Sequence, residues 1–248
     1  VGAFMVVHLT VNASILNSPG TFQKSVYQIH SLGRLLPIVE WAFIFAPILF
    51  HGIFGLVIIR GGLSNAGRYP YANNIRYTLQ RASGVIALLF IIWHVFHMHG
   101  WFHFDGWMKN VVEPLGGAQF KPFSAASTVG LAMQGVVTKV LYAIGLIACV
   151  FHLANGLWTM GITWGVWTSP AAQKRANVIC SSLGVALFLI SMSALYGVST
   201  VDQKAATTVE EAMYQSKTES GEIEANTHKR SDGEKHGKQE YTDARLKR

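Results

Sequence analysis

Acidic side chains are scarce over most of this sequence, and their scarcity excludes a water-soluble fold for that part. The chain has 248 residues and 13 Asp and Glu, of which 10 follow Val201. Residues 1–200 therefore carry only three acids, beside 11 Lys and Arg. A soluble domain of this size could not cover its surface with so few charges. Residues 1–200 are expected to form a membrane domain, and the polar residues 201–248 a disordered tail.

The sequence also lacks the cysteine and basic patterns of several other protein classes. Its two cysteines, Cys149 and Cys180, lie singly inside apolar runs without CxxC spacing, so neither a disulfide nor a cysteine metal site is expected. The Lys and Arg residues are scattered between apolar runs rather than gathered into a phosphate-binding stripe. No nucleic-acid partner is therefore expected.

Five apolar segments can cross a membrane, which takes about 20 helical residues. They cover approximately residues 1–16, 35–59, 75–99, 138–162 and 176–199, and the first is the shortest. Pro47 lies inside the second segment, where a kink is expected. The sequence thus predicts an all-α integral membrane bundle of five transmembrane helices.

Basic residues predict the orientation of this bundle. They are densest in the loop between the second and third spans and in the loop between the fourth and fifth. The residues concerned are Arg60, Arg68, Arg76, Arg81, Lys174 and Arg175. Loops of this kind stay in the cytoplasm, so the chain is expected to start inside and its tail to lie outside.

Each of four apolar segments carries a histidine at depth: His8, His51, His94 and His152. A titratable ring inside hydrocarbon is costly and needs a partner. Because successive spans run in opposite directions, His51 and His152 are expected in the cytoplasmic half, and His8 and His94 in the outer half. The bland interpretation, hydrogen bonds between helices, suits a lone membrane histidine better than two matched layers.

Two neutral imidazoles that face each other at one depth can ligate a haem iron from both sides. Such an iron transfers electrons and has no open position for a substrate. His97 follows His94 by three residues on a similar helix face and could replace it as the ligand. His99 and His103 are interpreted as interfacial, and no nearby carboxylate or cysteine supports a metal site made from them with His97.

Several stretches around these histidines resemble one known family. They are GAFMVVHL (2–9), PILFHGIFG (47–55), NAGRY (65–69), LQRASG (79–84), WHV (93–95) and FHLANGLW (151–158). The chain resembles the two-haem cytochrome b membrane anchor of succinate dehydrogenase and fumarate reductase, in its single-subunit, five-helix form. An Arg-Leu-His-Ser-like stretch that usually precedes the first helix is absent, and the polar tail is not typical of the family.

The resemblance implies that four of the five helices enclose two b haems. Their axial ligands would be His51 with His152 on the inner side and His8 with His94 on the outer side, which favours His94 over His97. It also implies a bacterial cytoplasmic membrane, with a covalent-FAD flavoprotein and an iron–sulfur subunit on the cytoplasmic side. Electrons from succinate would reach a membrane quinone, often menaquinone. The direction of the reaction and any higher oligomer of the complex stay open.

Two charged residues are candidates for roles beside the haems. Glu40 is the one acid within a span and could move protons at a quinone site near the outer haem. Pairing with Arg34 at the interface is an equally acceptable role for it. Arg81 could bind a haem propionate or act as a cytoplasmic anchor.

The sequence is also compatible with other functions. The anchor cytochrome b of another respiratory enzyme, such as a hydrogenase or a nitrate reductase, would show similar histidines. A haem-free transporter or structural anchor would use them as proton relays or packing contacts.

Overall fold

The computed structural model describes residues 1–62, 64 and 66–231 of the chain. The described residues contain helices and loops and no strand, as expected. Four long apolar helical segments can cross a membrane: Gly33–Arg60, Ala72–His99, Val136–Thr163 and Pro170–Thr200. The first predicted span is a shorter apolar helix, Gly2–Leu16, in which α1 (Gly2–Ala13) continues as a 3₁₀ turn. Asn65 of the NAGRY stretch lies outside the described residues.

The second predicted span combines several helical types. It passes through α3 (Leu36–Glu40), a π-helical turn (Trp41–Phe45) and α4 (Ala46–Arg60). Proline has no N–H, and its ring clashes with the carbonyl four residues before it. A widened π turn directly ahead of Pro47 relieves this conflict and explains the irregularity at the expected kink.

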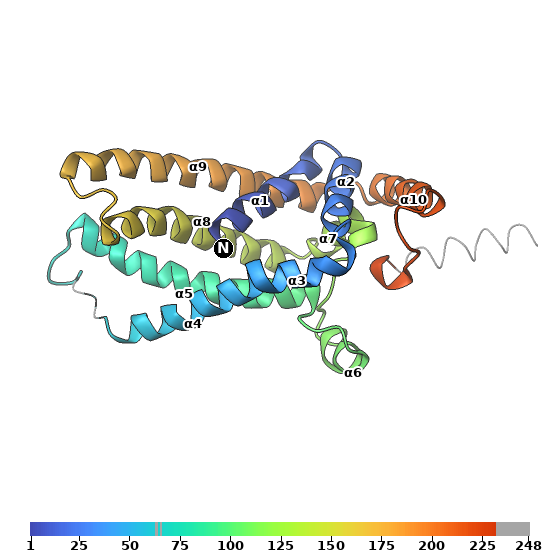
Figure 1. The fold of residues 1–248 in the computed structure, drawn as a ribbon, viewed down its shortest axis with the longest axis horizontal. Helices are drawn as coiled ribbons and strands as arrows, with labels where there is room; N and C mark the ends of the chain where they lie inside the picture. The colour runs from blue at the N-terminus through green and yellow to red at the C-terminus, as the bar shows by residue number, and fades with distance from the viewer. Residues whose placement is uncertain (63, 65, 232–248) are drawn as a thin grey trace, which may run out of the picture.

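Three spans form the centre of the bundle and alternate in direction (Figure 1). They are α5 (Ala72–His99), α8 (Val136–Thr163) and α9 (Pro170–Thr200). Helix α8 packs on both α5 and α9, and α1 packs on α9. Helix α4 lies at the edge against α5, and none of its residues is buried.

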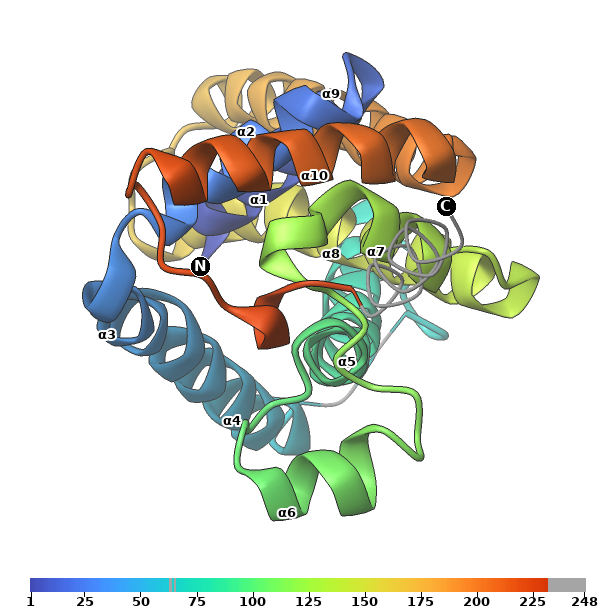
Figure 2. The same cartoon turned by 90° about the vertical axis from the view of Figure 1, so that its right-hand side faces the viewer.

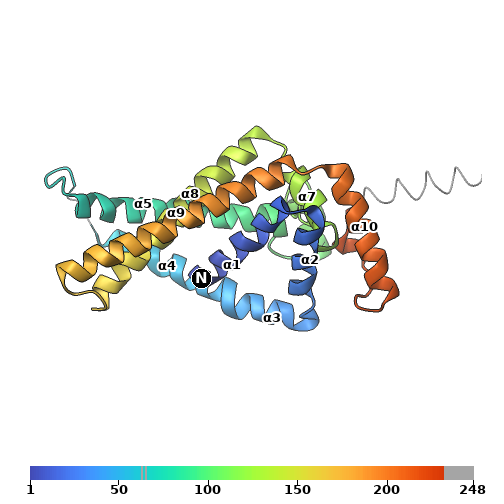
Figure 3. The same ribbon diagram turned by 90° about the horizontal axis from the view of Figure 1, so that it is seen from above.

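The two ends of the bundle differ. At one end, called here the loop end, the chain turns through residues 61–71 and 164–169. At the other, the capped end, three helices lie across the spans (Figures 2 and 3). These are α2 (Pro19–His30), α7 (Ala125–Ala132) and α10 (Gln203–Glu219), while the single turn α6 (Asp105–Trp107) lies to one side (Figure 2).

The expectation of a disordered tail is wrong for residues 203–231. Asp202 caps α10 by accepting hydrogen bonds from the N–H groups of Lys204 and Ala205. Ala206, Glu210 and Tyr214, spaced by four residues, form a buried stripe on this helix. The stripe packs on α2 and α7, so a few well-placed side chains order a polar segment. Residues 232–248 of the predicted tail lie outside the described residues.

Candidate functional site

The four deep histidines meet in two pairs between the helices. The imidazole rings of His51 on α4 and His152 on α8 have centroids 5.9 Å apart and planes inclined by 72°. The rings of His8 on α1 and His94 on α5 are also 5.9 Å apart and inclined by 72°. The first couple, the loop-end pair, lies toward the loop end, and the second, the capped-end pair, lies toward the capped end. These are the couples that helix direction predicts.

Helix α5 holds His152 of the loop-end pair. Its Nδ1 lies 3.1 Å from the carbonyl oxygen of Gln80, to which an Nδ1–H can donate. The Gln80 side chain donates from Nε2 to the carbonyl of His152, at 3.1 Å. A Cβ on Gly84 would lie 2.8 Å from Cε1 of His152, so glycine leaves room for the ring. His51 is exposed on α4 and makes no hydrogen bond with its side chain among the residues that the structure describes.

An aromatic enclosure holds the capped-end pair. His94 stacks on Phe90 with a centroid distance of 5.7 Å, and His8 stacks on Phe4 at 5.4 Å. The hydroxyl of Tyr142 lies 3.0 Å from Nδ1 of His94 and 3.0 Å from Nδ1 of His97. Tyr142 did not emerge from the sequence analysis, although a polar hydroxyl inside the fourth apolar span is a signal for it.

The other histidines of the third span are placed differently. His97 lies flat against Trp93, with centroids 5.0 Å apart and planes inclined by 6°. The ring that faces His8 is therefore that of His94. The rings of His99 and His103 are in contact, with centroids 4.4 Å apart. The described residues contain no cluster of three potential metal ligands. Burial, and then the charge of Lys121, lower the pKa of His103, which favours a neutral ring beyond the end of the span.

A polar network links the loop-end pair to α9. Asn155 donates from Nδ2 to Oε1 of Gln80 at 2.8 Å. Arg76 donates to Oδ1 of Asn155 at 2.8 Å and to Oδ1 of Asn177 at 2.7 Å, and it covers the Trp158 ring. The sequence predicts Arg76 only as one of the basic loop residues. Its position one turn inside an apolar helix indicates the buried partners that the structure shows.

Arg81 and Glu40 lie at opposite ends of the α3–α4 span. The Arg81 guanidinium donates to the carbonyl oxygen of Gly62, beyond the last turn of α4, and lies over the Tyr77 ring at 4.4 Å. Glu40 ends α3, directly before the π turn, and is half-buried. Among the described residues it has neither a hydrogen-bond nor an ion-pair partner, so the expected alternative of an Arg34 pair is not found.

The fold and the site together define a class: an all-helical integral membrane protein whose intramembrane histidines face each other in two layers. The comparison with curated proteins agrees with this class. The chain is 29% identical over 196 residues to the succinate dehydrogenase cytochrome b558 subunit of Bacillus subtilis (strain 168), across 79% of this chain and 89% of that protein. This similarity confirms the predicted resemblance to the cytochrome b subunit of succinate dehydrogenase. No protein-family model and no solved structure matches the chain.

Proposed function

We propose that this chain is the membrane anchor and electron-transfer subunit of a succinate:quinone oxidoreductase. In this proposal the loop-end pair and the capped-end pair each ligate the iron of one haem b. The observation that carries it is the equal spacing of the two pairs, each with ring centroids 5.9 Å apart. The name of the Bacillus relative supports the same conclusion.

The spacing suits a bis-histidine metal centre. Two imidazoles that bind one metal ion from opposite sides, through bonds of about 2 Å, have ring centroids roughly 6 Å apart. A histidine ligand also usually donates its other ring N–H to an acceptor, which fixes the tautomer. Gln80 O supplies that acceptor for His152, and the Tyr142 hydroxyl supplies it for His94. His8 differs, because its Nε2 lies 3.4 Å from the Asn12 amide nitrogen and its ring must turn to bind through that atom.

When bound, haem b supplies reversible one-electron exchange in each layer. His51 with His152, and His8 with His94, would hold the two irons and leave neither iron an open position for a substrate. Arg81, at the loop end, is proposed to bind a propionate in exchange for its contact with Gly62. The chain alone does not contain the succinate site.

The loop end is proposed to face the cytoplasm of a bacterial cell. Its basic residues favour this side, and a flavoprotein with covalent FAD and an iron–sulfur subunit would dock there. The capped end then faces outward, and the quinone, expected to be menaquinone, reacts near the capped-end pair. A higher oligomer of the complex is compatible with this arrangement.

Glu40 is proposed to transfer protons to and from that quinone. It is half-buried at the end of its span toward the capped end, where an unpaired carboxyl is a functional candidate. Glu40→Gln should lower quinone reductase activity by about tenfold or more. Glu113→Gln, which changes an exposed acid outside the spans, is the matched control. Unchanged activity in Glu40→Gln would exclude the proton role.

A reduced-minus-oxidised spectrum of the purified chain tests the proposal directly. Two low-spin haem b signals, with co-purification of a flavoprotein and an iron–sulfur protein, are expected. Haem signals without the flavoprotein would indicate the anchor of another respiratory enzyme. Absence of haem from a folded preparation would leave the histidines as proton relays or packing contacts in a transporter or structural anchor, and the proposal would be rejected.

A further inference from the structure

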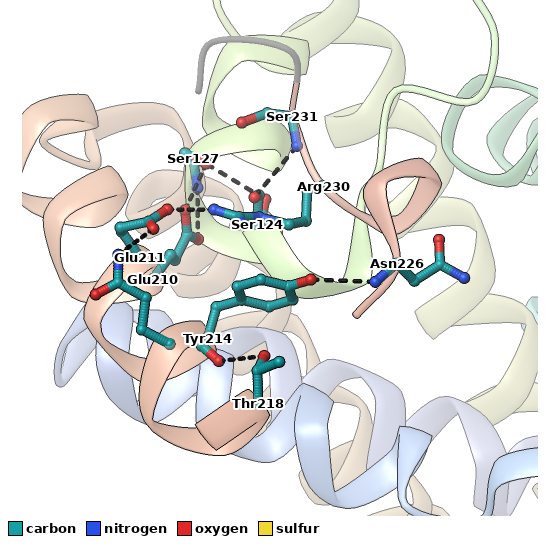
Figure 4. A network of polar contacts seen from close by, with 10 residues as sticks. Ser124, Ser127, Glu210, Glu211, Tyr214, Thr218, Asn226, Arg230 and Ser231 are labelled. Carbon is teal, nitrogen blue, oxygen red and sulfur yellow. Dashed lines mark hydrogen bonds and ion pairs between the residues drawn. The ribbon is translucent and has the colours of Figure 1, made fainter. Parts of the chain in front are cut away.

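Helix α10 closes the capped end of the bundle by crossing it. Viewed from that end, α10 runs transversely in front of α1, α2 and α8 (Figure 2). It packs on both α2 and α7, two helices that also lie across the spans. The segment after α10 returns to α7, where the Ser231 N–H donates to Oγ of Ser124 at 3.3 Å (Figure 4). Residues 203–231 therefore contact the start of α7 both through α10 and through Ser231.

Glu210 joins α10 to the first turn of α7. Only 1% of its surface is exposed, and its Oε1 accepts hydrogen bonds from the backbone N–H groups of Ala126 at 2.6 Å and Ser127 at 3.0 Å. Its Oε2 accepts from the Ser127 hydroxyl at 2.5 Å. The first N–H groups of a helix have no partner within the helix and attract negative charge. Glu210 satisfies two of them, and Gln23 of α2 accepts from the N–H of Ala125 at 2.8 Å.

The hydrogen bonds that Glu210 accepts offset part of the cost of burying its carboxyl group. Burial raises the pKa of the Glu210 carboxyl, while its hydrogen bonds from Ser127 and Ala126 lower it. The bonds thus offset part of the free energy that burial of the carboxylate costs. Removing the carboxyl would leave the Ala126 and Ser127 N–H groups buried without partners, a loss larger than that of an ordinary surface contact.

Apolar packing continues from this contact toward the histidines. Ala206 of α10, Met133 beside α7 and Tyr142 of α8 belong to one buried cluster. Tyr142 in turn shares its hydroxyl between His94 and His97. A second cluster, of Tyr27, Phe123 and Tyr214, fixes the far part of α10.

We propose that α10 is a cap that seals the capped-end pair from water, and that Glu210 is the latch that holds the cap on α7. The sealed cluster keeps Tyr142 in the position that orients His94. Glu210 is thus a positioning residue, which acts on the histidine layer through the cap. The latch stands on the contacts above, whereas its effect on a haem rests on the function proposed in the preceding section.

Hydrogen exchange of the purified complex tests the latch. In Glu210→Ala, the amides of α10 and of Ala126 and Ser127 should exchange more than about tenfold faster, because the cap opens locally more often. Protection of the α5 and α8 segments at the loop end should not change. Glu219→Ala, an exposed acid on the same helix, is the matched control and should behave as the wild type. Unchanged protection of α10 and the α7 amides in Glu210→Ala would overturn the proposal.

Two further variants test the latch even if the Glu210→Ala protein does not fold. Glu210→Gln keeps an acceptor for the two N–H groups and should restore most of the protection. Ser127→Ala removes only the hydroxyl donor and should produce a smaller increase in exchange. If Glu210→Ala cannot be purified, the proposal stands only if Ser127→Ala raises exchange in α10, and an unchanged Ser127→Ala protein overturns it.

The haem potentials then test the seal. Opening the cap should move the midpoint potential of the capped-end haem to a more negative value, since water stabilises the ferric charge, and leave the loop-end haem unchanged. Faster exchange with both potentials unchanged would overturn the sealing role and leave the proposed function intact. Absence of haem from the wild-type complex would instead overturn the proposed function, while hydrogen exchange still decides the latch.

Discussion

The loop-end pair and the capped-end pair have the same ring geometry but different support. Both pairs show centroids 5.9 Å apart and planes inclined by 72°. In the capped-end pair, aromatic rings enclose both imidazoles, and Tyr142 bonds His94. In the loop-end pair, Gln80 holds His152, whereas His51 is exposed on a helix without a buried residue. One layer is organised by protein contacts, and the other is organised on one side only.

Because of this difference, the stability of the two layers should depend to different degrees on a bound haem. Helix α4 packs on α5, with Gly52 close to Leu88, and Arg81 bonds the carbonyl of Gly62 just after α4 ends. These contacts are few for an element that supplies a metal ligand. A group bound between His51 and His152 would therefore contribute much of the stability of α4, whereas the capped-end pair would hold its shape without one.

The largest expected effect is the loss of a single haem from one layer. His51→Ala or His152→Ala should remove the loop-end haem completely and leave the capped-end haem, while His8→Ala and His94→Ala should do the reverse. One remaining histidine holds a haem iron weakly, and His97, which lies flat against Trp93, is not placed to replace His94. Haem content per chain and the reduced-minus-oxidised spectrum measure the result.

His103→Ala is the control for these substitutions, because its ring packs on His99 and belongs to neither pair. It should keep both haems. If one alanine variant from each pair, such as His51→Ala and His94→Ala, removed the same haem, the assignment of two separate layers would be wrong. Retention of both haems in His152→Ala would exclude that residue as a ligand.

The next effect concerns α4 and separates the two layers by their dependence on haem. In protein produced without haem, amides of α4 should exchange more than about tenfold faster than in the loaded protein, about 1.4 kcal/mol in local opening free energy. Amides of α5 around His94 should change much less, because protein contacts already order that layer. Equal loss of protection in both helices would show that the two layers depend on haem to the same degree.

The sequence predicts the long spans and the pairing because both depend on strong, simple signals. Apolar length sets the spans near residues 72–99 and 136–163, and alternating direction places His51 with His152 and His8 with His94. The ordered tail was missed because Ala206, Glu210 and Tyr214 are only a sparse stripe in a polar segment. Tyr142 and Gln80 were missed as partners because their role depends on which neighbours α5 and α8 bring together, which no local pattern records.

A smaller effect is expected from crowding His152. Gly84→Ala would place a Cβ 2.8 Å from Cε1 of that ring, which must move to avoid it. Overpacking of this kind costs about 1–3 kcal/mol, so the affinity of the loop-end layer for haem should fall by about tenfold. Gly106→Ala, where a Cβ meets nothing within 4 Å, is the matched control. Haem titration of the apo-protein measures both, and a Gly84→Ala protein with wild-type affinity would show that the ring sits elsewhere when haem is bound.

The smallest effect compares the groups that orient one histidine of each layer. If His94 binds iron through Nε2, its Nδ1–H donates to Tyr142, whose hydroxyl then donates to His97. Tyr142→Phe removes this acceptor and makes the imidazole a weaker donor of charge to the iron. The midpoint potential of the capped-end haem should therefore rise by roughly 40 mV, which corresponds to about 1 kcal/mol in a one-electron couple.

The same test at the loop end should give almost no shift in potential. The acceptor for His152 is the main-chain carbonyl of Gln80, which Gln80→Leu retains. That variant loses the side-chain bonds to His152 O and to Asn155, and the 3.2 Å contact of the Gln80 amide nitrogen with Nδ1 of His152. When Nδ1 carries a proton, this last contact is not a hydrogen bond, so the variant should weaken packing rather than alter the ring's basicity. A redox titration that resolves the two haems measures the potential shift in each variant. A shift in Gln80→Leu as large as that in Tyr142→Phe would mean that the amide side chain, and not the main chain, sets the tautomer of His152.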